Sequence, residues 1–502
     1  MKARRVLAAL TALYGLSACS AGASSEMAGV PRSYTEQRLT WAPCRNLPQG
    51  TPLAHFQCAT MKVPLDYAEP DGDTIGIALI RQRASDPAHR IGSLIFNFGG
   101  PGGSGVQGLA ANPGSYTELN TRYDLVGFDP RGVGQSAPVD CLTDTQTDAQ
   151  AKTVDPSPDD AAELAAFKAA DAQTLAGCSA RSGKVIPYVG TPNTSRDMDV
   201  LRAVLGDARL HYFGISYGTW LGGNYAHLFP SHVGRIVLDG AVDPKISFED
   251  LSLQQAAAFQ RALGNFAASC AAQPVASCPL GRSGHAIVAG VASLLQSLDR
   301  HPLPTRGGRR LTRSLGESGV LMPLYSETYW PYLEEGLEQA EHGDGTILLL
   351  LADAQSGRGA DGHYDNLGSA NTAIRCADTT ERHTYEQAQA AVPRFRKASP
   401  IFGPSQAWGL TQCTGWPYRG DNAGQEVSAP GTAPIVVIGN TGDPATPYAW
   451  APALAKELGN GVLVTLHGQG HGAYVTGDPC IQSTVNSYLL DGTVPAPHTT
   501  CR

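Results

Sequence analysis

The sequence has no basic cluster and no interleaving of basic with aromatic residues, the pattern typical of nucleic-acid-binding proteins. Its 37 lysines and arginines face 45 acidic residues, and only 16% of all residues are charged. It also has no C-x-x-C pair, so a structural zinc site is not expected, and it has no internal repeat. With 502 residues, 42% of them hydrophobic, the chain can bury one large core or two smaller ones.

The N-terminus resembles an export signal. Three basic residues precede an apolar stretch, residues 6–16, that is too short to cross a bilayer as a helix. The stretch ends in Leu16-Ser17-Ala18-Cys19, which resembles the bacterial lipobox, where the cysteine is lipidated and becomes the mature N-terminus. We expect a signal peptide over 1–18, lipidation at Cys19, a tether over 19–40 and an exported protein at the cell envelope. A plain secretory signal is the alternative, and the only expected membrane contact is the lipid anchor.

Ten cysteines remain besides Cys19, an even number in a chain expected to be exported. This predicts five disulfides. Pairing of nearest neighbours would close short loops, although other connectivities stay open at this point. The nearest-neighbour pairs are Cys44–Cys58, Cys141–Cys178, Cys270–Cys278, Cys376–Cys413 and Cys480–Cys501.

Short apolar runs alternate with helical patterns along most of the chain. An alternating run over 74–80 predicts an antiparallel strand with one buried face. Continuous apolar runs, typical of parallel strands buried on both faces, lie at 93–98, 123–128, 210–213, 235–240, 433–439 and 461–466. Helical patterns separate several of them, at 195–205, 219–229 and 448–458. This order predicts an α/β fold with a mostly parallel, doubly wound sheet, whose functional groups lie at the carboxyl ends of its strands.

Residues 245–432 interrupt this order with helical patterns at 253–270, 286–298, 321–340 and 346–353. A segment of this size is too long for a loop, so we expect a mainly helical lid over the strand ends. Stretches rich in proline and glycine at 301–310 and 357–368 are its expected exposed connections. The core is then formed by residues 41–244 and 433–502.

The pentapeptide Gly214-Ile215-Ser216-Tyr217-Gly218 follows one apolar run and enters a helical pattern. A sharp turn between strand and helix presents a serine oxygen at the strand end, so Ser216 is the candidate nucleophile. An ordinary glycine-rich turn could also produce this motif. Its position in the chain is what favours the functional interpretation.

Several segments together resemble, in order and spacing, the α/β-hydrolase peptidases of the proline iminopeptidase and tripeptidyl aminopeptidase group. They are 97–105 (NFGGPGGSG), 129–136 (DPRGVGQS), the serine pentapeptide, 442–444 (GDP) and 468–472 (GQGHG). The resemblance covers nearly the whole mature chain, and is closest to the secreted, disulfide-containing tripeptidyl aminopeptidases of actinobacteria. In one departure, Asn97-Phe98 stand where the family commonly has a histidine before the Gly-Gly-Pro-Gly run.

The α/β-hydrolase order of serine, acid and histidine selects Asp443 and His471 as partners of Ser216. His471 would take the serine proton and pass it to the leaving amine, while Asp443 would orient the imidazole. His467 competes with His471 for this role, but the glycine-rich loop around His471 favours the latter. Asp478 follows the histidine, which is the wrong order for the acid.

Two backbone N–H groups are expected to stabilise the oxyanion of the acyl-transfer intermediate. Tyr217, directly after the nucleophile, supplies one, and Gly100 in the turn after the 93–98 strand supplies the other. We interpret Asp129 and Arg131 as structural residues that hold a turn beside the serine.

An aminopeptidase must bind a protonated N-terminus, for which a carboxylate in the pocket is the physical solution. The candidate acids of the lid are Glu327, Glu334, Glu335 and Asp378.

We predict an exported serine exopeptidase that uses no cofactor or metal and removes short peptides, tripeptides by resemblance, from free N-termini. One alternative is an envelope esterase or lipase with the same triad, and another is an inactive hydrolase fold that serves as a binding lipoprotein. The sequence leaves the oligomeric state open.

Overall fold

The computed structural model describes residues 30–45, 47–48, 51–112, 114–273 and 278–502. The predicted signal peptide and the lipidation site at Cys19 lie outside the described residues. None of the helices in the described part combines the length and the apolar character that a membrane span requires.

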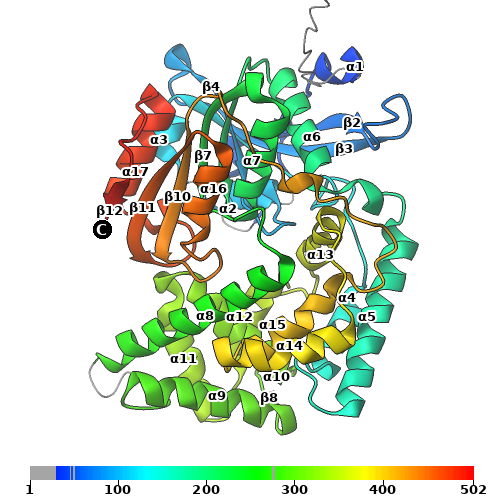
Figure 1. Cartoon of the computed structure of the whole chain (residues 1–502), viewed down its shortest axis with the longest axis vertical. Coiled ribbons are helices and arrows are strands. Elements are labelled where there is room, and N and C mark those ends of the chain that lie inside the picture. The colour runs from blue at the N-terminus through cyan, green and yellow to red at the C-terminus, as the bar shows by residue number, and fades with distance from the viewer. Residues whose placement is uncertain (1–29, 46, 49–50, 113, 274–277) are drawn as a thin grey trace, which may run out of the picture.

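Ten strands form one sheet in the order β1-β2-β3-β5-β4-β6-β7-β10-β11-β12 (Figure 1). The first three pairings are antiparallel, and all pairings from β5 to β12 are parallel. This confirms the predicted mostly parallel sheet and every strand expected from the sequence. The strands are β1 (Ala42–Pro43), β2 (Phe56–Pro64), β3 (Thr74–Gln82), β4 (Gly92–Asn97), β5 (Tyr123–Phe128), β6 (Leu210–Ile215), β7 (Val233–Asp239), β10 (Ile435–Gly442), β11 (Gly461–Gln469) and β12 (Thr499–Cys501).

Helices cover both faces of the sheet. Along β4, Ile95 belongs to the core on one face, while Leu94 and Phe96 belong to the core on the other. Because successive side chains of a strand point to opposite faces, burial on both sides requires the continuous apolar runs seen in the sequence. One face packs against α6 (Thr191–Val204), α7 (Tyr217–Leu228) and α16 (Trp450–Leu458), and the other against α2 (Gly105–Ala111), α3 (Thr117–Asn120) and α17 (Pro479–Asn486).

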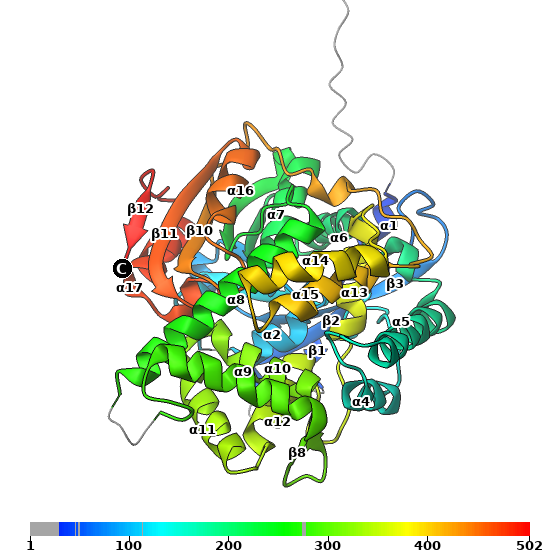
Figure 2. The same ribbon diagram turned by 60° about the horizontal axis from the view of Figure 1, so that its bottom comes forward.

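The expected lid segment lies at one end of the sheet and has an apolar core of its own (Figures 1 and 2). The helix expected over 321–340 is broken into two short turns, Met322–Tyr325 and Glu327–Tyr329, followed by α11. Pro323 and Pro331 explain the breaks, because proline is favoured in the first turn of a helix and disrupts the helix interior. The lid helices are α8 (Phe248–Ala271), α9 (Gly284–Arg300), α10 (Arg313–Leu321), α11 (Trp330–Glu341), α12 (Thr346–Ser356), α13 (Leu367–Asp378), α14 (Tyr385–Ala398) and α15 (Gly403–Trp408), with a hairpin of β8 (Leu303–Pro304) and β9 (Arg310–Leu311).

A second helical segment outside the sheet, which the sequence did not reveal, follows β5. It contains α4 (Asp144–Thr153) and α5 (Ala161–Ser182), which run along one side of the lid (Figure 1). Among the residues of α5 only Cys178 and Ser182 are buried, so its sequence shows little apolar periodicity. The absence of that pattern is why these helices escaped prediction.

All five nearest-neighbour disulfides form, which confirms the predicted pairing. Two of these disulfides fasten helices that lie outside the sheet, α5 and the lid helix α13. Cys141–Cys178 ties the end of α5 to the chain that leaves β5, and Cys376–Cys413 ties α13 to the short helix Gly409–Cys413.

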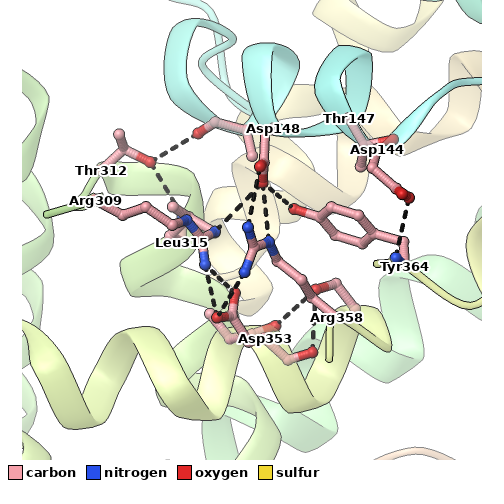
Figure 3. A network of polar contacts seen from close by, with 12 residues as sticks. Asp144, Thr147, Asp148, Arg309, Thr312, Leu315, Asp353, Arg358 and Tyr364 are labelled. Carbon is pink, nitrogen blue, oxygen red and sulfur yellow. Dashed lines mark hydrogen bonds and ion pairs between the residues drawn. The ribbon is translucent and has the colours of Figure 1, made fainter. Parts of the chain in front are cut away.

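A network of ion pairs joins α4 to the lid (Figure 3). The Asp148 carboxylate accepts hydrogen bonds from Nε and Nη2 of Arg358, both at 3.0 Å, and from Tyr364 Oη at 2.8 Å. Arg309 Nη1 donates to both oxygens of Asp353 at 2.8 and 2.6 Å. Burial tends to raise the pKa of Asp148, but the hydrogen bonds and charge of its partners hold it below its ordinary value. The 357–368 stretch is thus anchored to α4, not merely an exposed connection.

We expect Arg358→Met to lower the free energy of unfolding by about 1–2 kcal/mol at pH 7, because two charge-assisted hydrogen bonds of a half-buried carboxylate are lost. A carboxylate with a lowered folded-state pKa stabilises the fold above its unfolded pKa, and this contribution is lost as the pH falls through the lowered value. Urea unfolding at several pH values should therefore show the deficit of the variant shrinking below about pH 4.

The control is Arg306→Met, which removes an exposed pair with Asp344 and should change stability by less than about 0.5 kcal/mol. Equal effects of the two substitutions, or a deficit independent of pH, would contradict a stabilising role of the network.

Candidate active site

Ser216 lies at the turn between β6 and α7, where the parallel strands present their carboxyl ends. Its backbone has φ 58°, an unusual conformation for a residue other than glycine. A Cβ on Gly218 would lie 2.7 Å from the carbonyl oxygen of Asn97, so a larger residue would not fit. The turn therefore has the strand, tight turn and helix that a nucleophile elbow requires.

The glycine-rich loop after β4 contacts this turn directly. A Cβ on Gly99 would lie 2.6 Å from the carbonyl oxygen of Ile215 and 2.8 Å from Cβ of Ser216. Gly99 N–H donates to Oδ1 of Asn97 at 3.0 Å, so the residue that departs from the family pattern supports the loop. Only a residue without a side chain allows this approach.

The predicted oxyanion donors, Gly100 and Tyr217, line one cavity together with Ser216. Within the described residues, neither their N–H groups nor the Ser216 hydroxyl has a hydrogen-bond partner. Unused backbone donors beside a candidate nucleophile are what an oxyanion hole needs.

His471 and Asp443 follow β11 and β10, and they contact each other. Nδ1 of His471 lies 3.0 Å from each carboxylate oxygen of Asp443, and its backbone N–H donates to the carbonyl oxygen of Tyr325 in the lid at 2.8 Å. Asp443 also accepts from the N–H groups of Ala445 at 2.9 Å and Thr446 at 2.7 Å. The carboxylate is thus fixed by the backbone and in turn fixes the imidazole.

The environment of His471 favours the imidazolium form. Burial alone would lower the pKa of His471, but the charge and hydrogen bond of Asp443 raise it above its ordinary value. Ser216 and His471 line one open cleft, and within the described residues no hydrogen bond joins them. Such bonds are often long in a structure without substrate. A base that can hold a proton beside a serine suits acyl transfer through a covalent intermediate.

The rival residues lie elsewhere. His467 is exposed on β11, and Oδ1 of Asp478 accepts the N–H of Ile481 at the start of α17.

Arg131 is fully buried and pairs with Asp197 at 2.7 Å, in keeping with the expected structural role. Asp129 accepts from the Ser104 hydroxyl at 2.6 Å and from Gln135 N–H at 2.9 Å.

A second buried carboxylate, which the sequence analysis missed, holds the histidine loop. Asp239, at the end of β7, accepts the N–H groups of Ala473 at 2.9 Å and Tyr474 at 2.9 Å, two and three residues after His471. Burial raises the pKa of Asp239 to about 6. Its signal in the sequence was its place at the carboxyl end of an apolar run.

Of the four acids expected to bind an N-terminus, the structure brings only Asp378 to the cavity of Ser216. Asp378 is 3% exposed and accepts from the N–H and hydroxyl of Thr191 at 2.7 and 2.6 Å. Burial raises the pKa of Asp378 to about 7. Its position at the end of α13, beside the sheet, was not visible in the sequence.

The other three acids lie away from this cavity, at the surface of the lid. Glu327 and Glu335 are exposed, and Glu334 accepts a hydrogen bond from Gln273 at 2.9 Å. The cavity instead contains two charged residues that the sequence analysis did not name, Arg375 and Glu381. The cavity also has an apolar wall of Trp220, Val242, Ile246, Leu251 and Trp450.

Comparisons with known proteins agree with this geometry. The family described as TAP-like protein matches residues 399–501, the part of the chain that contains Asp443 and His471. The chain is 38% identical to serine protease Hip1 of Mycobacterium tuberculosis (strain ATCC 25618 / H37Rv) over 480 residues, which cover 93% of this chain and 91% of that protein.

Two other relatives have different names. Carboxylesterase B of the same M. tuberculosis strain is 37% identical over 472 residues, covering 92% of this chain and 89% of that protein. Tripeptidyl aminopeptidase of Streptomyces coelicolor is 32% identical over 475 residues, covering 92% and 86%. Because these similarities extend over nearly the whole chain, the protein belongs to the TAP-like family of α/β-hydrolases and is a serine hydrolase of its peptidase group.

Proposed function

We propose that this protein is an exported serine exopeptidase that releases short peptides, tripeptides by family likeness, from free N-termini. The observation that carries the proposal is a buried carboxylate, Asp378, in the cavity that also contains Ser216 and the N–H of Tyr217. A carboxylate in a restricted pocket beside the nucleophile suits a substrate whose ammonium group must be recognised.

In the proposed reaction, His471 removes the proton of Ser216 as the serine oxygen attacks the scissile carbonyl carbon. The N–H groups of Gly100 and Tyr217 donate to the oxyanion that forms. His471 then gives the proton to the leaving amine, and an acyl-enzyme remains. Water, activated by the same histidine, releases the short peptide and restores the serine. Asp443 keeps Nδ1 protonated, so that Nε2 is the nitrogen that exchanges protons.

The lid limits the length of peptide that can reach the serine. Asp378 belongs to α13, which contributes to the wall of the cavity, and α8 contributes Leu251 and Gln255 to the same wall. A substrate whose ammonium group pairs with Asp378 would have its scissile bond a fixed distance away. The distance between acid and nucleophile would thereby set the length of the released peptide.

We expect Ser216→Ala and His471→Ala each to lower kcat/KM by at least about 1,000-fold, and Ser216→Ala to leave the thermal midpoint unchanged, because the serine serves the reaction and not the core. A fluorophosphonate probe should label Ser216. His467→Ala is the matched control and should keep activity within about twofold. Ser216→Ala activity within tenfold of the wild type would refute the assignment.

We expect acetylation of the substrate N-terminus to lower kcat/KM by about 30-fold or more, because it leaves the buried carboxylate unpaired. With a pKa of about 7, Asp378 ionises as the pH rises, so the preference for free over acetylated substrate should grow from pH 6 to about 7.5. It should decline again as the substrate amine, with an ordinary pKa of about 8, loses its proton.

Asp378→Asn should abolish this preference and its pH dependence, whereas Glu335→Gln, a change on the lid surface, should preserve both. Equal cleavage of free and acetylated tripeptidyl amides by the wild type would refute exopeptidase action.

The similarity to carboxylesterase B supports one competing function, hydrolysis of an envelope ester by the same triad. Fold and triad do not determine which acyl group is cleaved. A wild type that cleaves short acyl esters but no peptide amides would establish the esterase function. A chain that cleaves neither and does not react with the fluorophosphonate would be an inactive binding protein.

We further propose that the protein is held at the cell envelope by a lipid on Cys19. The lipobox-like sequence before Cys19 supports this localisation. The wild type should partition into detergent, and Cys19→Ala should appear in the medium, because a lipid chain is needed to keep the protein at a membrane. Release of wild type and variant in equal amounts would instead indicate a simple secretory signal.

A further inference from the structure

Helix α13 of the lid packs directly on the glycine-rich loop beside Ser216. A Cβ on Gly102 would lie 2.8 Å from the carbonyl oxygen of Leu367 and 3.0 Å from the N–H nitrogen of Asn371. Nδ2 of Asn371 also donates to the carbonyl oxygen of Pro101 at 3.0 Å. The first half of α13 is therefore positioned by the same loop that supplies the predicted oxyanion donor.

Arg375 lies one turn further along this helix. Its Nε donates to Oδ1 of Asn371 at 3.0 Å, and its guanidinium lies 5.7 Å from the ring centroid of Phe248. These two contacts orient the side chain. Arg375 lines both the cavity with the apolar wall and the open cleft, and Ser216 lines both as well.

The terminal nitrogens of Arg375 have no acceptor among the described residues, and no carboxylate there lies within ion-pair distance of them. Other arginines of the protein differ in this respect. Arg382 donates from both terminal nitrogens to four carbonyl oxygens, and Arg131 is paired with Asp197. A guanidinium that is oriented but keeps its outer donors unused is suited to a ligand that supplies an acceptor.

The surroundings of Arg375 indicate which acceptor fits. Asp378 and Glu381 line the same cavity, so a carboxylate ligand would meet two acidic side chains there. A neutral carbonyl oxygen accepts the same hydrogen bonds without that repulsion. A peptide substrate carries such oxygens at every residue, whereas a simple acyl ester has only the carbonyl that is attacked.

We propose that Arg375 binds a backbone carbonyl oxygen of the substrate peptide, other than the carbonyl of the scissile bond. This inference rests on the proposed peptidase function and adds a residue that selects peptides over simple esters. Arg375 takes no part in proton transfer. It holds the peptide chain beside Ser216 through the terminal nitrogens of its guanidinium.

The test compares Arg375→Met and Arg375→Lys with the wild type on three substrates: a tripeptidyl amide, its N-acetyl form and a butyrate ester. For Arg375→Met, kcat/KM should fall about 10- to 100-fold on both peptides, the range for a lost hydrogen bond to a charged group, and stay within about threefold on the ester. The kcat/KM of Arg375→Lys on the peptides should lie between those of the wild type and Arg375→Met, because lysine keeps the charge but lacks the planar guanidinium. Ester turnover also shows that each variant is folded.

Arg382→Met is the matched control. It removes an arginine that bonds only to the protein backbone, so it should lower the thermal midpoint but leave the ratio of peptide to ester turnover unchanged. Equal losses on peptide and ester in the Arg375 variants would overturn the proposal, as would unchanged peptide turnover. A loss confined to peptides with acidic side chains would also overturn it, in favour of a carboxylate site.

The two proposals fail in different ways. Arg375→Met should lower the turnover of acetylated as well as free peptides, because acetylation leaves the backbone carbonyls in place. If the wild type shows no preference for a free N-terminus, but Arg375→Met still lowers peptide turnover, only exopeptidase action is refuted. A wild type that cleaves no peptide would overturn both.

Discussion

The active site depends on a contact between two backbones that leaves no room for a side chain. Gly99 meets the turn of Ser216, and Gly102 meets the first turn of α13. A short glycine-rich loop thereby links the end of β4, the candidate nucleophile and the lid. Any Cβ at these positions would push the elements apart by moving backbone, which packed interiors resist. The relative position of serine, oxyanion donor and lid helix follows from this one constraint.

Carboxylates fix the other half of the site. Asp443 accepts hydrogen bonds from the backbone after β10 and holds the imidazole of His471, while Asp239 holds the backbone that follows the histidine. The loop of His471 contains several glycines and would otherwise have many conformations. Two buried acids from neighbouring strands replace the rigidity that the loop lacks. Burial raises the pKa of Asp239 to about 6, and the charge and hydrogen bond of Asp443 raise the pKa of His471.

The lid belongs to the site and does more than cover it. Tyr325 accepts the N–H of His471, α13 brings Arg375 and Asp378 to the cavity, and α8 provides part of the apolar wall. The ion-pair network around Asp148 connects α4 to α12 and to the segment before α13, and the disulfide Cys376–Cys413 connects α13 to the short helix Gly409–Cys413. A lid anchored at so many points keeps its charged groups at defined positions relative to Ser216, which the proposed selection of substrates by length requires.

The sequence alone determined the parallel sheet, the five disulfides and the candidates Ser216, Asp443 and His471. Each of these leaves a local pattern: an apolar run, an even set of neighbouring cysteines, or glycines and an acid directly after a strand. The sequence could not separate Asp378 from Glu327, Glu334 and Glu335, because it does not show which acids of the lid face the cavity and which face solvent. It also missed α5, Asp239 and Arg375. Their roles arise from contacts between residues far apart in the chain, such as Asp239 with Ala473, and only the tertiary structure decides such contacts.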